Sequence, residues 1–132
     1  MSEMAAIVRE FVLETNENLD RLEQDIVELE KNPTSRPTLT RIFRTLHSIK
    51  GATGFLGFTR LGAIANAGEG VLSRLRDSVL VINPEITDSL LSLADTIRQT
   101  VSKINETGQE GADDYAALIV RLNQLKEGTV PK

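Results

Sequence analysis

Apolar residues recur at intervals of three and four along almost the whole chain, and this periodicity constrains the fold more than any other feature of the sequence. An α-helix turns by ~100° per residue, so this spacing gathers apolar side chains on one face of a helix. No stretch alternates apolar and polar residues convincingly, as a half-buried strand does. The sequence therefore predicts an all-α protein built from amphipathic helices that bury their apolar faces together.

Prolines, glycines and loop-forming residues divide this pattern into five helices. The predicted helices cover residues 3–31, 37–56, 59–77, 84–107 and 113–126. Pro37 and Pro84 suit the first turns of the second and fourth helices, and Thr59 and Asn83 are expected to cap the third and fourth. The first helix should bury an apolar stripe that begins at Ile7. The short connections favour an up-and-down bundle of five helices with a four-helix-bundle core.

The composition narrows the possible classes of protein. The chain has 132 residues, of which 40% are hydrophobic and 26% are charged, which is typical of one soluble globular domain. No apolar run is long enough to cross a membrane, and no cysteine is present for disulfides, thiolate metal sites or nucleophilic catalysis. A cytoplasmic location is expected. We assign residues 1–127 to the domain and residues 128–132 to the start of a linker or tail.

The charge distribution is uneven along the chain. No Asp or Glu occurs from Lys31 to Gly68, a segment with six Lys and Arg residues, whereas the remainder carries nine cations and 19 acidic residues. A basic segment therefore lies on an acidic body. This segment could be a docking face for an acidic or phosphorylated partner, or an unevenly charged but merely solvated surface.

His47, the only histidine, lies inside the predicted second helix. On a helical wheel its side chain points more than ~100° away from the centre of the apolar stripe, so it should face solvent. Arg44 and Lys50 flank it at ~60°, and Gly51 and Gly54 lie within ~40° of it. Each helical glycine costs about 0.5–1 kcal/mol relative to alanine. A functional requirement could explain why glycines are present despite that cost. Without side chains beside His47, another protein could reach the imidazole.

Glu69 is the best candidate for a partner of this imidazole. It lies ~80° from Leu61, at the margin of the apolar face of the third helix, with Asn66 on the same polar margin. A carboxylate that accepts a hydrogen bond from one ring nitrogen would fix the tautomer and make the other nitrogen a better nucleophile. A solvated glutamate fits the periodicity equally well. Gly68 points inward and suits close helix packing, whereas Gly70 has no explanation at this level.

Lys50 adds a compact cation one turn from His47 that can meet a phosphoryl oxygen. An exposed imidazole, a carboxylate across the helix groove, a neighbouring ammonium and an open approach together make a plausible acceptor for a phosphoryl group. A metal site is not expected, because one histidine without a second imidazole or a cysteine is a poor ligand set.

Three segments of the chain resemble a known family. They are HSIKGATGFLGF at 47–58, LGAIANAGEGVLSRLRD at 61–77 and INPEITDSLLSLADTIRQTV at 82–101. Together they resemble the N-terminal histidine phosphotransfer (HPt) domain of chemotaxis histidine kinases of the CheA type. The resemblance implies that His47 is phosphorylated at a ring nitrogen, that Lys50 and Gly51 belong to the site motif and that Glu69 pairs with the ring. Asn66 stands where the family often has a second histidine.

The resemblance also implies the partners. A histidine kinase catalytic domain, which would hold ATP and Mg²⁺, is expected to phosphorylate the domain, and a response regulator receiver domain is expected to take the phosphoryl group onto an aspartate. The sequence itself has no Walker-type loop, so this chain would be a phosphocarrier without a cofactor, within a CheA-like kinase. We expect a monomer that binds neither nucleic acid nor membrane.

Two alternatives stay open. A free-standing HPt relay protein would use the same chemistry. A protein of a different class, a helical interaction module without catalytic chemistry, would use the basic face only for docking.

Overall fold

The computed structural model describes residues 3–128 and consists of five helices. They are α1 (Glu3–Lys31), α2 (Arg36–Leu56), α3 (Thr59–Arg76), α4 (Pro84–Thr107) and α5 (Ala116–Glu127). Within the described part of the chain no strand is present, so the predicted all-α class is confirmed. Residues 129–132 of the predicted linker lie outside the described residues, and Gly128 caps α5.

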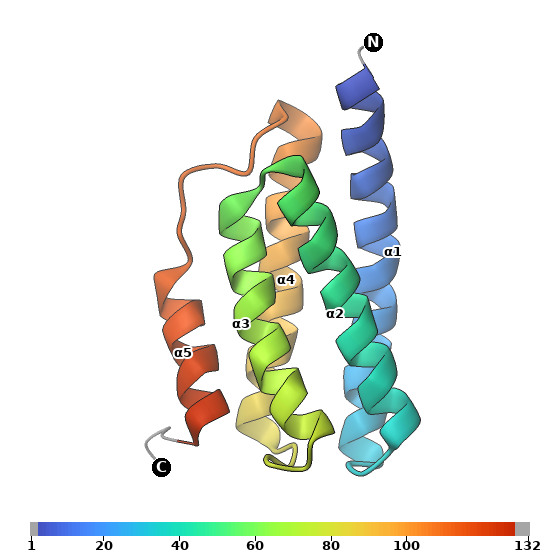
Figure 1. Ribbon diagram of the computed structural model, residues 1–132, viewed down its shortest axis with the longest axis vertical. Coiled ribbons are helices and arrows are strands. Elements are labelled where there is room, and N and C mark those ends of the chain that lie inside the picture. Colours follow the sequence, from blue (N-terminus) through green and yellow to red (C-terminus); the bar gives the residue numbers. More distant parts are fainter. Residues whose placement is uncertain (1–2, 129–132) are drawn as a thin grey trace.

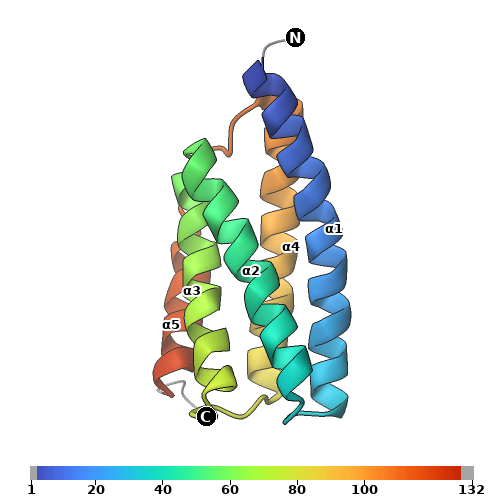
Figure 2. The ribbon, with the colours of Figure 1, turned by 45° about the vertical axis from the view of Figure 1, so that its right-hand side comes forward.

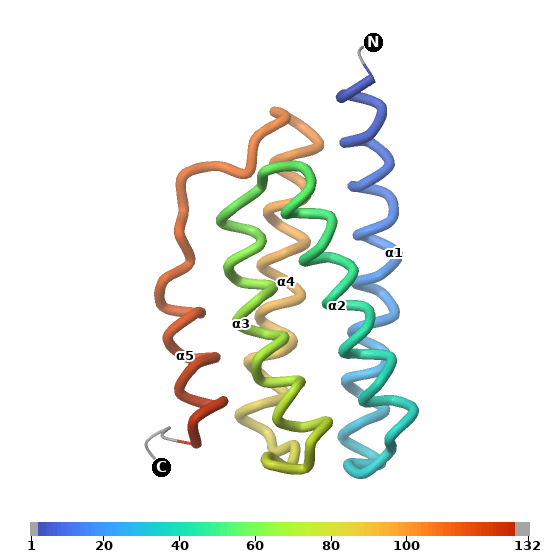
Figure 3. Tube along the Cα trace, viewed as in Figure 1, coloured from blue at the N-terminus to red at the C-terminus, as the bar shows by residue number. Residues whose placement is uncertain are grey.

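The first four helices run up and down in sequence order and form the core bundle (Figure 1). Helix α5 runs antiparallel to α4 and packs mainly against α3 on the outside of the bundle (Figures 1 and 3). The two helices that carry the conspicuous polar residues, α2 and α3, are neighbours with the most extensive contact in the molecule. No described helix is long and apolar enough to cross a membrane.

Local sequence signals set the starts of α2 and α4. Asn83 Oδ1 accepts a hydrogen bond from the Ile86 N–H at 2.8 Å, and Pro84 occupies the first turn, as predicted. Pro37 likewise lies in the first turn of α2. That helix begins one residue before the predicted start, because Ser35 caps it by accepting from the Thr38 N–H at 3.4 Å.

The predicted cap of α3 is wrong. Thr59 is already helical, and the N-cap position is held by Phe58, which offers no side-chain hydrogen bond. Glu110 in the α4–α5 loop replaces a local cap: its two carboxylate oxygens accept from the Arg60 N–H at 3.1 Å and the Leu61 N–H at 2.9 Å. A carboxylate at a helix N-terminus satisfies unpaired N–H groups and favours the helix dipole.

Helix α5 begins three residues after the predicted start. The carboxylates of Asp113 and Asp114 accept hydrogen bonds from the N–H groups of Tyr115 and Ala116, two residues further on, at 2.8 and 3.1 Å. These bonds stabilise a non-helical turn over residues 113–115, where the sequence predicts the first turn of the helix. Tyr115 adopts a left-handed conformation, with φ of 54°, and its hydroxyl hydrogen-bonds to Thr100 on α4 at 2.6 Å.

The apolar faces of all five helices meet in one core. The apolar faces that the helical period predicts for α1 to α4 are buried almost throughout. Ile7 is the clear exception, because 41% of it is exposed. It lies in the first turns of α1, which extend beyond the ends of α2 and α3 (Figures 1 and 2), so those two helices do not cover it there.

Candidate functional site

His47 lies on the outer face of α2, with 62% of its side chain exposed. Its neighbours Leu46 and Ile49 are buried in the core, so the helical period places the imidazole in solvent. The structure therefore confirms the exposure predicted from the sequence.

Glu69 on α3 lies across the groove from His47. Its Oε2 is 3.0 Å from His47 Nδ1, and its side chain is only 16% exposed. A carboxylate can only accept a hydrogen bond, so Nδ1 carries the proton in this pair and Nε2 of the neutral ring keeps its lone pair. The predicted pairing is thus present, and it leaves Nε2 as the ring nitrogen with an unused lone pair.

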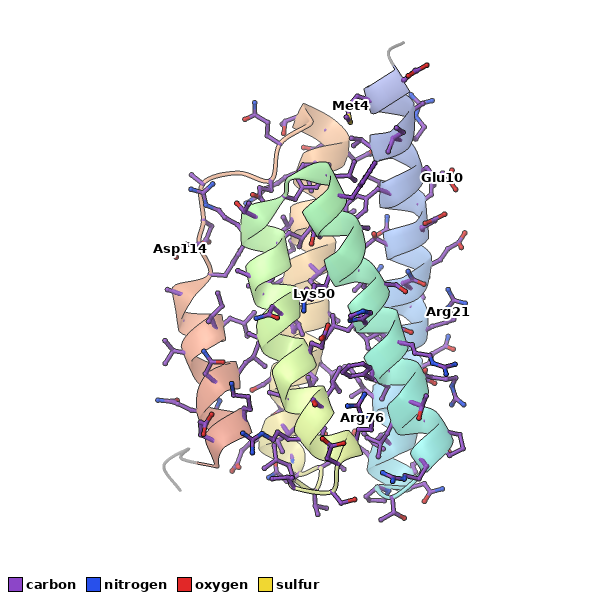
Figure 4. The ribbon with its side chains drawn as sticks, viewed as in Figure 1. Met4, Glu10, Arg21, Lys50, Arg76 and Asp114 are labelled. Carbon is purple, nitrogen blue, oxygen red and sulfur yellow. The ribbon has the colours of Figure 1, made fainter. Side chains whose placement is uncertain are left out.

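Lys50 completes a three-residue cluster with His47 and Glu69. Its ammonium nitrogen is 3.4 Å from Glu69 Oε1, so the two carboxylate oxygens each have their own partner. Figure 4 shows Lys50 between α2 and α3, half-way along the bundle. An ammonium has three N–H groups. One bond to Glu69 leaves the others available to a phosphoryl oxygen, the role that the sequence predicts.

Two kinds of glycine line this region. A Cβ on Gly51 or Gly54 would meet nothing within 4 Å, so both positions are open, as expected for an approach path. A Cβ on Gly68 would lie 2.2 Å from Leu93 Cδ2, so close packing requires this glycine. At Gly70 a Cβ would lie 3.0 Å from Lys126 Cδ. Lys126 of α5 crosses this position, so an added Cβ would make this lysine side chain shift by a few tenths of an ångström.

Asn66 and Arg44 lie near the cluster without bonding to it. Asn66 is exposed and lines a polar groove of about 320 Å³ beside Glu69, but within residues 3–128 no hydrogen bond joins it to His47. Arg44 is exposed, and it lines a shallow groove of about 230 Å³ between α1 and α2 together with Arg21 and Arg41. Asp25 pairs with Arg41 at 3.2 Å, and Arg44 pairs with no carboxylate of the described chain.

The sequence analysis missed two residues at the site. The Phe43 ring lies nearly parallel to the His47 ring, with 5.9 Å between the centroids and 10° between the planes. The guanidinium carbon of Arg76 lies 4.2 Å from the centroid of the Phe43 ring. Phe43 precedes His47 by one helical turn, so the i, i+4 spacing could have revealed that contact. No local pattern points to Arg76, which comes from the end of α3.

These observations define a class of site: a solvent-exposed imidazole on a helical bundle, with one ring nitrogen hydrogen-bonded to a carboxylate and the other open to solvent. Within the described part of the chain, no group of three or more acidic or histidine side chains could hold a metal ion. The family model of the Hpt domain matches residues 6–107. The chain belongs to the Hpt domain family and is a phosphotransfer domain of two-component signalling.

Known proteins with related sequences and folds support this assignment. The sensor histidine kinase CheAY of Helicobacter pylori is 36% identical over 110 residues, covering 83% of this chain and 14% of that protein. The solution structure of the histidine phosphotransfer domain of CheA has a TM-score of 0.83 and 29% identity, covering 100% of this chain and 96% of that one. This chain therefore spans a small part of the kinase that it matches.

A third known protein is similar to this chain in its fold alone. The phosphorylated P1 domain of CheA3 from R. sphaeroides, crystallised in complex with CheY6, has a TM-score of 0.84. Its sequence is 22% identical, and the match covers 96% of this chain and 99% of that domain.

Proposed function

We propose that His47 is the phosphoacceptor of this domain and that Nε2 is the atom that carries the phosphoryl group. The observation that supports this most directly is the 3.0 Å bond between Nδ1 and Glu69 on an imidazole that is otherwise exposed. That bond occupies Nδ1 and leaves Nε2 as the atom with both a lone pair and free access.

The proposed reaction has two displacements at phosphorus. The Nε2 lone pair attacks the γ-phosphorus of ATP, a P–N bond forms, and the P–O bond to ADP breaks with its electron pair leaving on ADP. A receiver aspartate then attacks the same phosphorus, and the electrons of the P–N bond return to Nε2. Neither step requires a proton from Nδ1. The proton can therefore stay on Nδ1, hydrogen-bonded to Glu69, and the carboxylate offsets the positive charge on the phosphorylated ring.

The residues around this pair have distinct proposed roles. Lys50 contacts a phosphoryl oxygen while it remains beside Glu69. Gly51 and Gly54 leave the approach to Nε2 open, and Arg44 contributes to a basic docking face. Asn66 is a peripheral member of the polar network, because it lines the groove without bonding to the ring.

The partners follow from this chemistry and from the relatives. We propose that a CheA-like kinase domain, separate from this chain, supplies the phosphoryl group from ATP with Mg²⁺. A response regulator receiver takes it, as the complex of the CheA3 domain with CheY6 suggests. The domain is proposed to act in the cytoplasm, as a monomer when isolated, and as part of a kinase like the chemotaxis relatives rather than as a free-standing relay.

The experiment compares the wild type with His47→Gln, using labelled ATP and a CheA kinase core. The wild type should acquire an acid-labile, alkali-stable label, whereas His47→Gln should stay folded by circular dichroism and acquire none. The chain has one histidine, so any phosphohistidine must be His47. Undiminished labelling of the variant would refute the proposal. A wild type that is never labelled but binds acidic partners with a steep salt dependence would favour the non-catalytic docking module.

A further inference from the structure

The ring of His47 is held at one point by a hydrogen bond and along one side by another ring. The bond to Glu69 fixes the position of Nδ1. It does not by itself fix the plane of the ring, because an imidazole can rock about a single N–H···O axis. Phe43 lies beside the imidazole with 10° between the two ring planes, an offset-parallel arrangement that aromatic pairs favour.

Phe43 is itself held in place. Its ring is half-buried and lies against the partly buried side chain of Arg76, whose guanidinium carbon is 4.2 Å from the ring centroid. Cations are attracted to the face of an aromatic ring at such distances. The backbone carbonyl of Arg76 accepts a hydrogen bond from the guanidinium of Arg36, the first residue of α2. This chain of contacts therefore joins two points of α2 through the end of α3, and these are the helices that also carry His47 and Glu69.

From this geometry we infer that Phe43, backed by Arg76, is a positioning residue that fixes the plane of the His47 ring and so aims Nε2 at an incoming phosphorus. This inference rests on the proposed function of His47. It assigns no chemistry to Phe43, which touches neither phosphorus nor a transferred atom. Its contribution is orientation, which matters when a docked partner presents the phosphorus from one direction only.

The size of the effect follows from the side-chain torsions. A histidine within a helix has two common χ1 wells, because χ1 near +60° clashes with the preceding turn, and roughly two χ2 orientations, about four arrangements in all. The Glu69 bond and the neighbouring ring together select one of them. Without the Phe43 ring, only the Glu69 bond favours the productive arrangement over the others, so that arrangement should be diluted by a factor between one and this limit. We expect a fall of about two- to fourfold in the maximal rate of transfer from the kinase.

The test uses one substitution at two positions of the same helix. Phe43→Leu removes the ring but keeps an apolar side chain, and Phe55→Leu makes the same change at a ring that is 78% exposed, eight residues beyond His47. Phe43→Tyr is the rescue variant, because Phe43 lines a groove of about 320 Å³ that can receive a hydroxyl group. Rates are measured at saturating CheA kinase core and ATP. They are also measured with phosphoramidate, a small donor that reacts with an imidazole without docking.

Orientation should matter only for the docked donor. Phe43→Leu is expected to slow phosphorylation by the kinase about two- to fourfold, whereas its rate of phosphorylation by phosphoramidate should equal that of the wild type. Phe43→Tyr and Phe55→Leu should behave as the wild type with both donors. NMR couplings of the His47 side chain should show rotamer averaging in Phe43→Leu alone.

Two results would overturn the inference while the proposed function stands. One is a Phe43→Leu rate equal to that of the wild type with the kinase. The other is an equal loss with both donors, which would mean that Phe43 affects reactivity or folding. A wild type that acquires no phosphohistidine from the kinase would instead overturn the proposed function, and this inference with it.

Discussion

The capping of α3 by Glu110 gives the sharpest stability prediction. Glu110 is almost fully buried, and its two oxygens accept from two backbone N–H groups at the start of the helix. Hydrogen bonds to a charged group contribute about 1.5–3 kcal/mol each. The Leu61 N–H is buried and loses its only partner in Glu110→Ala, whereas the more exposed Arg60 N–H can turn to water. The free energy of unfolding should therefore fall by about 2–3 kcal/mol.

The assay is urea unfolding followed by circular dichroism at 222 nm, supported by thermal melts. A loss of this size should lower the melting temperature by roughly 6–12 °C for a domain of this length. Glu110→Gln keeps one acceptor oxygen for the buried Leu61 N–H but loses the charge and the second acceptor, so it should lose about half as much. The control is Glu106→Ala, which removes an exposed carboxylate from the end of α4.

The reasoning would be refuted if Glu110→Ala lost no more stability than the Glu106→Ala control. It would also be refuted if Glu110→Gln were as destabilised as Glu110→Ala, because the cap would then not depend on an acceptor at this position. The variant should still be phosphorylated on His47 under conditions where it is folded, because Glu69 lies about two turns beyond the capped end of α3.

Three further predictions concern the packing and the site. Gly68→Ala should destabilise the fold by about 1–3 kcal/mol through overpacking against Leu93, measured by urea unfolding, and a neutral effect would contradict the close approach. Glu69→Gln should keep the fold and lower the maximal phosphorylation rate of His47 about 10- to 100-fold, the equivalent of one charge-assisted hydrogen bond; a wild-type rate would show that the bond does not assist catalysis. Arg44→Gln should weaken docking and its salt dependence in stopped-flow experiments without lowering the rate at saturation, and a lowered saturated rate would place Arg44 in the chemistry instead.

Features encoded within a few residues could be predicted from the sequence. The helical period placed His47 outward and Glu69 at the groove between α2 and α3, and both positions agree with the structure. Asn83 and Pro84 marked the start of α4 because a cap and its first turn are adjacent in the chain. In each case the determining contacts lie within one or two helical turns.

Features that depend on distant residues could not be predicted in this way. Glu110 caps a helix about 50 residues earlier in the chain, and the aspartates of its loop delay the start of α5. The contact of Gly70 with Lys126 exists only because α5 packs across this part of α3. The contact of Arg76 with Phe43 joins the end of α3 to the middle of α2. Periodicity reports which face of a helix is buried, but it does not report which side chain from another helix will meet it.

The account depends most on Nε2 being the atom that accepts the phosphoryl group while Nδ1 stays bonded to Glu69. NMR of the domain with ¹⁵N-labelled histidine, before and after phosphorylation by a CheA kinase core, tests this directly. We predict a proton on Nδ1 in both states and a ³¹P–¹⁵N coupling to Nε2 in the phosphorylated state. A phosphorus coupling to Nδ1, or a proton on Nε2 in the unphosphorylated ring, would contradict the mechanism.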